Sequence, residues 1–230
     1  MKADRAAVLL GRTHLFGELD QDAIFRLAER ADERTCDKGE IVVQEGTPGG
    51  SLFVVVTGLL KVFVTSPGGE EMVLVTLKPA DVFGELALVD GGPRSASAQA
   101  LERSTLLVLG RNALLEIVQE EPSLTDALLR SVGALVRRLT AQAADLVFLD
   151  LHGRVAKLLL GLAEDQGEQT ESGKVLDLHM TQSDLAHMVG GSRQSVNQIL
   201  RSFEERGYVE LRGRQILVKD PESLRRRALP

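Results

Sequence analysis

The chain has few of the residues that redox centres and disulfide frameworks need. Among its 230 residues there is one cysteine, one tyrosine and no tryptophan. A single cysteine excludes an intrachain disulfide, an iron–sulfur ligand set and a cysteine zinc site. Cys36 lies in a segment rich in strand-forming residues, and we interpret it as a small core residue.

Long apolar runs are also missing. The longest, such as LFVVV and ALLRSVGALV, fall well short of the ~20 residues that a membrane-spanning helix needs. The first residues, MKADRAAVLLGR, hold only a short apolar stretch between charges, which is too little for a signal peptide. The sequence therefore predicts a soluble, cytoplasmic protein with no membrane partner.

Residue patterns typical of catalysis are absent as well. We find no Ser–His–Asp arrangement, no paired carboxylates and no metal-ligand spacing, so we expect no enzyme, no catalytic residue and no metal. We interpret all four histidines as surface or packing residues rather than ligands: His14, His152, His179 and His187.

The net charge of −6 is unevenly distributed along the chain. Residues 1–150 hold 15 basic against 22 acidic side chains, whereas residues 193–227 hold 9 against 5. An excess of basic residues at the C-terminus is typical of a segment that meets phosphate groups.

The residue pattern changes twice along the chain, from helical to strand-like and back to helical, which predicts a globular α+β protein. Residues 4–34 carry apolar positions at helical spacing. Between about 35 and 110, short runs of Val, Leu and Phe are separated by glycines, which indicates an antiparallel sandwich or barrel. Within it, SPGGEE (66–71) reads as a hairpin turn. Beyond 111 the period becomes helical again.

Pro122 and Ser123 begin a predicted helix of about 28 residues, nearly 40 Å long. Such a helix is too long for one small barrel to cover, so a partner helix is implied, although a single helix lying on its own barrel stays an alternative. The predicted apolar stripe consists of Leu128, Val132, Leu135, Leu139, Leu146 and Leu149.

The C-terminal part follows the order of a winged helix-turn-helix. VAKLLLGLAED predicts a helix, and GEQTESGK (167–174) predicts a polar loop. Two short helices around a GGS turn occupy 181–204, and two strands, YVEL and QILV, flank an RGR turn.

The stretch FGELALVDGGPRSASA, residues 83–98, can form an anion pocket. Gly84 lets the backbone approach a ligand closely, and a helical turn at ELAL would direct its first amides outward. Arg94 supplies a planar cation and Ser95 a hydroxyl donor, while Glu85 suits the hydroxyl of a ribose. The alternative is an Arg–Glu ion pair that closes a surface loop.

Residues 181–214 can read DNA. Thr181 with Asp184 forms a predicted capping box at the first helix, and Ser192 caps the second. The second helix would bury Val196, Ile199, Leu200 and Phe203, and it would direct outward Arg193, Gln194, Asn197, Gln198 and Arg201. Phosphate contacts are expected from Thr181, Ser192, Ser195 and the wing residues Arg212 and Arg214. A polar helical hairpin that reads nothing is the alternative.

We call residues 83–98 the cassette. With its Gly-Glu-Leu-Ala-Leu start and Pro-Arg-Ser end, it resembles the phosphate-binding cassette of cyclic-nucleotide-binding domains. The whole chain resembles the cyclic-AMP receptor protein branch of the cyclic-AMP receptor protein/fumarate–nitrate regulator (Crp/Fnr) family of bacterial transcription factors. The resemblance implies an antiparallel β-roll over 1–120, a dimerisation helix and hinge over 121–150, and a winged helix-turn-helix over 151–230.

The family pattern also implies roles for residues. The ribose would meet Gly84 and Glu85, and the cyclic phosphate would meet Arg94 and Ser95. Leu86 is also expected to contact the nucleotide. The adenine-contacting pair falls at Leu139 and Thr140, and the hinge at Phe148, Leu149 and Asp150. Leu139 departs from the polar residue that is usual there, so cyclic AMP is preferred but cyclic GMP stays open.

The expected function is therefore that of a homodimeric regulator of transcription. It would bind double-stranded DNA and RNA polymerase, and a cyclic nucleotide between β-roll and long helix would control it without haem, iron–sulfur cluster or metal. Gln194 replaces the usual glutamate and Gln198 a common basic residue, which puts the family's usual operator in doubt. Two alternatives stay open: a regulatory module acting on a protein partner, and a DNA-binding regulator that needs no ligand.

Overall fold

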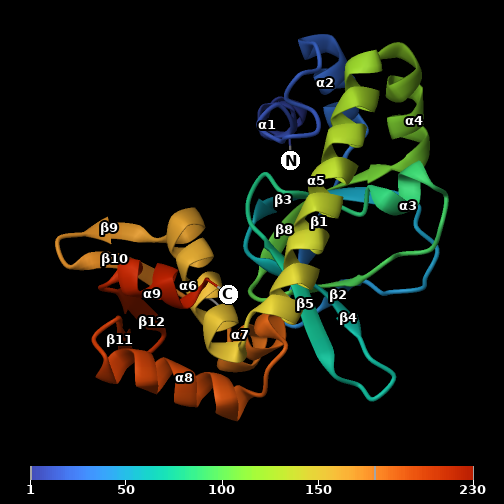
Figure 1. Ribbon diagram of the computed structural model, residues 1–230. Helices are drawn as coiled ribbons and strands as arrows, with labels where there is room; N and C mark the ends of the chain where they lie inside the picture. The colour runs from blue at the N-terminus through green and yellow to red at the C-terminus, as the bar shows by residue number, and fades with distance from the viewer. Residues whose placement is uncertain (1, 179, 230) are drawn as a thin grey trace. The chain divides into compact units, whose positions relative to one another are not determined.

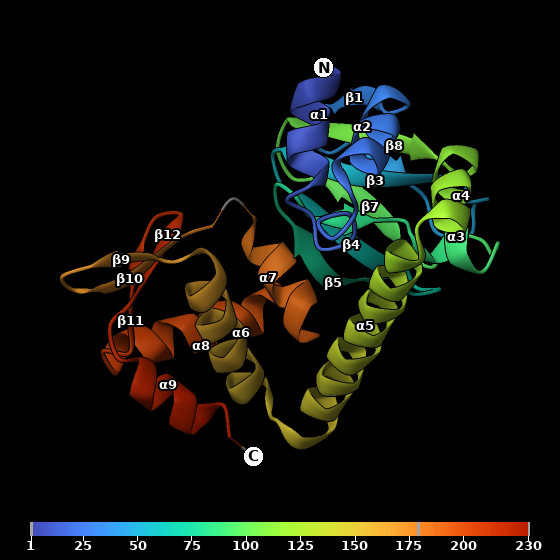
Figure 2. The same ribbon diagram turned by 90° about the horizontal axis from the view of Figure 1, so that it is seen from above.

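The computed structural model describes residues 2–178 and 180–229 and has the predicted α+β architecture (Figures 1 and 2). His179, one of the histidines considered above, lies outside the described residues. The chain divides into two compact units, Met1–Arg137 and Arg138–Pro230. None of the helices in the described part combines the length and apolar character needed to cross a membrane.

The first unit contains two antiparallel sheets preceded by two helices, α1 (Ala3–Leu10) and α2 (Gln21–Glu29). One sheet has the strand order β1-β8-β3-β6 and the other β2-β7-β4-β5. The strands are β1 (Asp32–Cys36), β2 (Ile41–Val43), β3 (Ser51–Thr57), β4 (Leu60–Thr65), β5 (Glu71–Leu77), β6 (Val82–Phe83), β7 (Ser97–Ala100) and β8 (Ser104–Gly110). The predicted sandwich or barrel is thereby confirmed.

Two hydrophobic clusters stabilise this unit. The cluster between the sheets joins Phe53 and Leu106 to Leu60 and Ala98, and it contains Cys36. Cys36 is fully buried, as predicted, and its burial raises the pKa of the thiol. The second cluster packs α1, α2 and the following helices on the outer face of the β3–β8 sheet.

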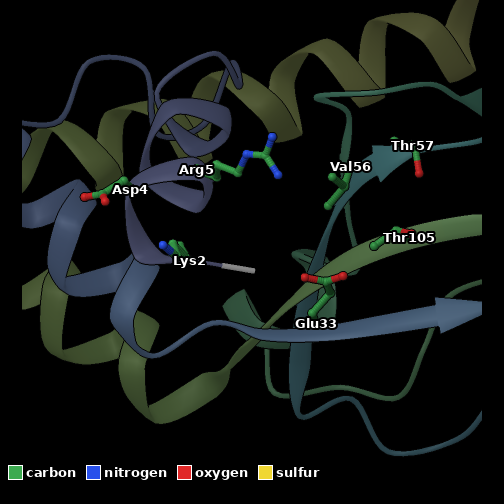
Figure 3. Close-up of a pocket in the computed structure, with 7 residues that line it drawn as sticks. All are labelled: Lys2, Asp4, Arg5, Glu33, Val56, Thr57 and Thr105. Atoms are coloured by element: carbon green, nitrogen blue, oxygen red, sulfur yellow. The ribbon is translucent and has the colours of Figure 1, made fainter.

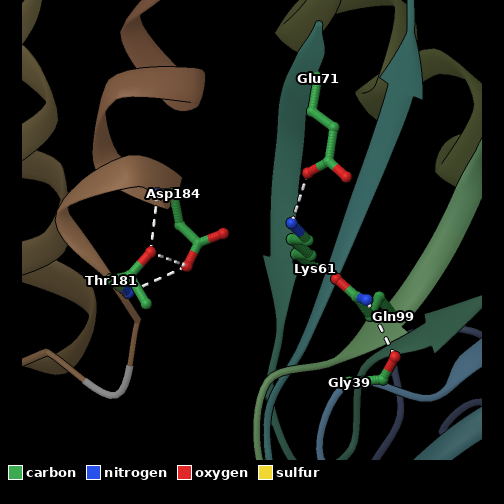
Figure 4. Close-up of polar contacts among 6 residues, drawn as sticks. All are labelled: Gly39, Lys61, Glu71, Gln99, Thr181 and Asp184. Atoms are coloured by element: carbon green, nitrogen blue, oxygen red, sulfur yellow. Dashed lines mark hydrogen bonds and ion pairs between the residues drawn. The ribbon is translucent and has the colours of Figure 1, made fainter. Parts of the chain in front are cut away.

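The predicted hairpin turn at SPGGEE joins β4 to β5, where Thr65 pairs with Glu71. On this hairpin the ammonium group of Lys61 is buried, which would be unfavourable without a partner. Its Nζ lies 2.6 Å from Glu71 Oε2 (Figure 4). The same atom lies 4.9 Å from the centroid of the Phe63 ring. Nearby, the Gln99 amide donates to the carbonyl of Gly39 at 2.9 Å.

Two helices follow the sheets: α4 (Arg111–Glu120) and α5 (Pro122–Phe148). A further short helix, α3 (Leu86–Val89), lies in the cassette. As predicted, α5 begins at Pro122, and its first turns bury Leu124, Ala127 and Leu128 in their own unit.

The apolar stripe predicted for α5 needs one correction. Leu128 and Leu149 are 9% and 7% exposed, so both are covered within this chain. The large apolar side chains that remain exposed on the helix are Leu129, Val136, Leu139, Leu146, Val147 and Phe148. The face of α5 available to a partner is thus displaced by one residue at its N-terminal end.

The second unit begins with α6 (Leu151–Gln166). It continues with β9 (Glu168–Thr170), β10 (Gly173–Asp177), α7 (Gln182–Val189), α8 (Arg193–Glu205), β11 (Val209–Arg212), β12 (Gln215–Val218) and α9 (Pro221–Arg227). The strands form one antiparallel sheet in the order β11-β12-β10-β9.

Two features of this unit differ from the prediction. The polar loop expected at 167–174 includes the β9 strand and its turn into β10; all three residues of β9 are exposed, and backbone pairing alone identifies it as a strand. Helix α9 was not predicted, although Asp220 caps it and Pro221 occupies its first turn. Leu224 is its only buried residue, so an apolar period could not indicate it.

Candidate functional site

The cassette is organised around the guanidinium group of Arg94. Its Nη1 donates to the carbonyl oxygen of Gly84 at 2.9 Å, and its Nη2 donates to the carbonyl oxygen of Ser51 at 2.7 Å. Arg94 Cζ lies 5.5 Å from the centroid of the Phe53 ring. Phe53 stacks in turn on Phe83, with 5.0 Å between the ring centroids. These contacts come from β3, β6 and the turn after β6, so the fold fixes the position of the cation.

Two glycines make this arrangement sterically possible. Gly84 has a φ of +85°, and an added Cβ would lie 2.6 Å from Arg94 Nη1. At Gly49 a Cβ would lie 2.2 Å from the Cβ of Ala87 in α3 and 3.4 Å from the guanidinium carbon. Any larger residue at either position would displace the arginine or the helix beside it.

Arg94 is 7% exposed, and none of the ion pairs within 4.0 Å in the described part of the chain involves it. Burial lowers the pKa of its guanidinium, and the charge of Glu85 opposes that shift from a longer distance. Two of its five N–H groups go to the two carbonyls, which leaves three donors for another acceptor. A buried cation of this kind favours an anion as its partner.

The alternative interpretation of the cassette, an ion pair that closes a surface loop, receives no support from these contacts. Glu85 is half-buried at the start of α3, and Leu86 is the first residue of that helix. Ser95 is exposed next to Arg94. The predicted residues of 84–95 therefore do lie together.

Sequence reasoning missed three residues of this site: Gly49, Ser51 and Phe53. The turn TPGG at 47–50 was a signal for a loop but gave no indication of its partner. Leu139 and Thr140, predicted to meet the base, lie in the other compact unit on α5, and their role stays a prediction.

A separate surface pocket of about 620 Å³ lies in the first unit (Figure 3). Lys2, Asp4 and Arg5 reach it from the start of the chain, and Glu33, Val56, Thr57 and Thr105 from the sheet. Its charges are mixed and it shares no residue with the cassette. Among the described residues, no group of three His, Cys, Asp or Glu side chains could hold a metal ion.

In the second unit, the predicted capping box of α7 is present (Figure 4). The Thr181 hydroxyl accepts from the Asp184 backbone N–H at 3.2 Å and donates to Asp184 Oδ2 at 2.7 Å. The same carboxylate accepts from the Thr181 backbone N–H at 2.9 Å. Helix α7 ends at Gly190, whose φ of +63° permits the tight turn into α8.

Helix α8 has the two faces that the sequence predicts. It buries Val196, Ile199, Leu200 and Phe203. Outside, Arg193, Gln194, Gln198 and Arg201 are exposed, and Asn197 is half-buried. Four long polar side chains on one accessible face can reach hydrogen-bonding groups of a partner.

The hydroxyls predicted to contact phosphate already have local partners. Ser192 caps α8 by accepting from the Ser195 N–H at 3.0 Å, and the two serine oxygens lie 2.8 Å apart. Thr181 is engaged with Asp184 as described. These three side chains therefore fix the start of each helix, and their contact with phosphate stays a prediction.

The residues predicted to form a hinge lie at the break between α5 and α6, and their role stays a prediction. Phe148 ends α5 and is exposed, while Leu149 is buried. Asp150 caps α6 by accepting from the Gly153 N–H at 2.8 Å, and it pairs with Arg227 of α9. The Gly153 hydrogen bond and then Arg227 lower the pKa of Asp150.

Removing the cap of α7 tests this local geometry. Replacing Thr181 by alanine leaves the Asp184 backbone N–H without its acceptor and the Asp184 carboxylate with one donor fewer, so the unfolding free energy of the second unit should fall by about 1 kcal/mol. Denaturant unfolding followed by circular dichroism measures the loss. Gln182→Ala, an exposed change in the same turn, should have little effect, and equal losses in both variants would contradict the capping role.

Comparison with known proteins identifies both units. Residues 33–121 match the family described as "Cyclic nucleotide-binding domain", and residues 153–227 match the "Crp-like helix-turn-helix domain". The chain is 37% identical over 221 residues to a "CRP-like cAMP-activated global transcriptional regulator" of Mycobacterium tuberculosis, with 96% of this chain and 98% of that protein covered. It is 33% identical to the "Cyclic AMP receptor protein" of Thermus thermophilus, with 77% and 79% covered.

Solved structures agree in fold. FixK2 of Bradyrhizobium japonicum superposes with a TM-score of 0.78 at 21% identity, and the match covers 87% of this chain and 98% of that one. The catabolite activator protein of Thermus thermophilus gives a TM-score of 0.54 at 29% identity, with 94% and 98% covered. Since a relative of 37% identity matches nearly the whole chain, the protein belongs to the Crp/Fnr family of transcriptional regulators.

Proposed function

We propose that the chain is a homodimeric, sequence-specific DNA-binding regulator of transcription, controlled by a cyclic nucleotide, with cyclic AMP preferred to cyclic GMP. The observation that carries this proposal is the buried Arg94 cation, which has three N–H donors left for an anion. One relative named as a cAMP-activated regulator and another named as a cyclic AMP receptor protein support it.

The residues of the cassette fit a cyclic nucleotide. A cyclic phosphate carries one negative charge and two free oxygens, which match the remaining donors of Arg94 and the hydroxyl of Ser95. Glu85, which would repel the phosphate at close range, is suited instead to accept from the ribose hydroxyl, beside Gly84 and Leu86. We assign the base to Leu139 and Thr140 from the family pattern.

The exposed face of α8 is suited to the major groove. Arg193 stands at its first position, where the guanidinium fork matches O6 and N7 of guanine. Gln194 carries both a donor and an acceptor, so it can pair with adenine and does not offer the strong acceptance that a glutamate offers to cytosine. Gln198 lacks the cation that is common there. We expect a palindromic site that keeps the guanine and shifts toward adenine beside it.

The proposed dimer would form through α5. Alternating steps of three and four residues place apolar side chains on one seam: Leu129, Val132, Val136, Leu139, Ala143 and Leu146. Leu129 is 66% exposed and Val136 56%, which is unfavourable for side chains of this size in water. This 3–4 pattern is typical of a two-stranded coiled coil, so a second copy is the partner that fits.

Control by the nucleotide requires two states that differ in affinity for it. Helix α5 carries the proposed base contacts and the dimer seam, and the break at Leu149–Asp150 follows it. We infer that the ligand favours the DNA-binding arrangement through this helix. RNA polymerase is the expected partner on DNA, the cytoplasm the expected location, and regulation rather than catalysis the expected activity.

The nucleotide site is tested by Arg94→Ala. Loss of a charge-assisted phosphate contact should weaken binding of cyclic AMP by about 2–5 kcal/mol, as measured by isothermal titration calorimetry with cyclic AMP and cyclic GMP. Arg103→Ala removes an exposed arginine outside the cassette and should leave the affinity unchanged. An Arg94→Ala variant with wild-type affinity would refute the assignment.

The seam is tested by Val136→Glu. Two carboxylates placed at a buried seam would face each other or apolar side chains, so the dimer should dissociate in light scattering at micromolar concentration. Ala141→Glu introduces the same charge on the opposite side of α5 and should remain dimeric. A monomeric wild type, or a dimeric Val136→Glu variant, would show that α5 is not the interface.

Base reading is tested by selection from a random DNA pool, with and without cyclic AMP. Arg193→Ala should lose about 1–3 kcal/mol and relax the preference at one base pair of each half-site. Arg214→Ala should weaken all sequences alike, since the wing meets the backbone. Recovery of no palindrome, or an Arg193→Ala variant with unchanged preference, would contradict this interpretation of α8.

A further inference from the structure

The wing is the β11–β12 hairpin, and an arginine stands on each side of its tip. Gly213 forms the tip with a φ of +63°, and nothing lies within 4 Å of the position that a Cβ would take. Arg212 and Arg214 flank it, and both are exposed. By sequence alone they are equivalent candidates for contact with phosphate.

Their surroundings are not equivalent. Arg212 Nε donates to Glu210 Oε1 at 2.8 Å, and Lys219 Nζ lies 2.9 Å from the other oxygen of the same carboxylate. The Arg214 carbonyl accepts from the Leu178 N–H at 3.2 Å, which ties this side of the wing to the rest of the sheet. The Arg214 guanidinium itself makes no ion pair with another described residue.

Two cations hold the carboxylate of Glu210. Hydrogen bonds from Arg212 and then Lys219 lower the pKa of Glu210 to about 2. Like any exposed glutamate, Glu210 is ionised near neutral pH, so its negative charge stands beside the two cations. Glu210, Arg212 and Lys219 together have a net charge of about +1, although they present two cations.

We propose that Glu210 limits the attraction of the wing for the DNA backbone. Arg214 is then the main phosphate contact of the wing, and Arg212 contributes little to phosphate binding. This inference rests on the proposed DNA-binding function. A phosphate that approaches Arg212 also approaches the Glu210 carboxylate, and the repulsion offsets the gain. Because the wing meets backbone and not bases, Glu210 sets affinity for all sequences without changing the preferred one.

Glu210→Gln tests the proposal, because it keeps the shape and removes the charge. Binding of the full-length protein to a random-sequence duplex is measured by fluorescence anisotropy between 50 and 200 mM salt, with cyclic AMP present. One additional phosphate contact steepens the salt slope by about 0.9. The variant should therefore bind more tightly at low salt and lose about 3- to 4-fold more affinity over this range than the wild type.

Two further variants isolate the cause. Glu222→Gln adds the same charge in the same unit, where Glu222 pairs with Arg225 on α9, and it should leave the salt slope unchanged. Glu210→Gln combined with Arg212→Gln should lose most of the gain. In selection experiments the preferred site of Glu210→Gln should match that of the wild type.

The sign of the effect separates the possible outcomes. Weaker binding by Glu210→Gln would mean that Glu210 orients Arg212 toward phosphate, and an unchanged slope would mean that the pair is irrelevant; either result overturns the proposal. An equal gain from Glu222→Gln would assign the effect to overall charge and overturn it as well. A wild type that binds no DNA at 50 mM salt would instead refute the proposed function itself, and the inference with it.

Discussion

A buried guanidinium is the constraint on which the cassette depends. Arg94 is charged and 7% exposed, and the cost of burying that charge is offset by fixed partners: two backbone carbonyls and the face of Phe53. Those acceptors require the backbone to approach closely, which explains the glycines at 49 and 84. β3 and the turn after β6 therefore both contact this one side chain. A cation that the fold holds in this way loses little conformational freedom when an anion binds.

Helix α5 has two different environments along its length. Its first turns belong to the core of the first unit through Leu124 and Ala127, whereas its later turns expose an apolar seam. Leu139 occupies the seam, and Thr140 follows it directly, so the residues proposed to meet the base stand beside the residues proposed to meet a second copy. We infer that a ligand bound at Thr140 would reach the proposed dimer seam through Leu139.

The sequence was most informative where one short segment determines its own structure. The buried face of α8 was predicted residue by residue, because spacings of three and four fix which side of a helix is covered. The capping box at Thr181 and the hairpin turn after Thr65 were local in the same way. By contrast, the Arg94–Ser51 contact joins residues 43 positions apart, and no local pattern indicates it. The exposed strand β9 was missed because only its backbone pairs, and α9 because it buries a single leucine.

For a regulator that binds DNA, limiting non-specific binding to DNA is as important as recognising the specific site. A genome offers many competing sites, so discrimination depends on the ratio of specific to non-specific affinity. The chain has a net charge of −6, and its basic excess is confined to residues near α8, the wing and α9. Within that segment, Glu210 cancels charge at the wing, and Glu222 pairs with Arg225. Among the described residues, Arg193, which we propose reads bases, and Arg214, which we propose meets phosphate, form no such ion pair. We infer that much of the attraction for DNA arises at these two side chains.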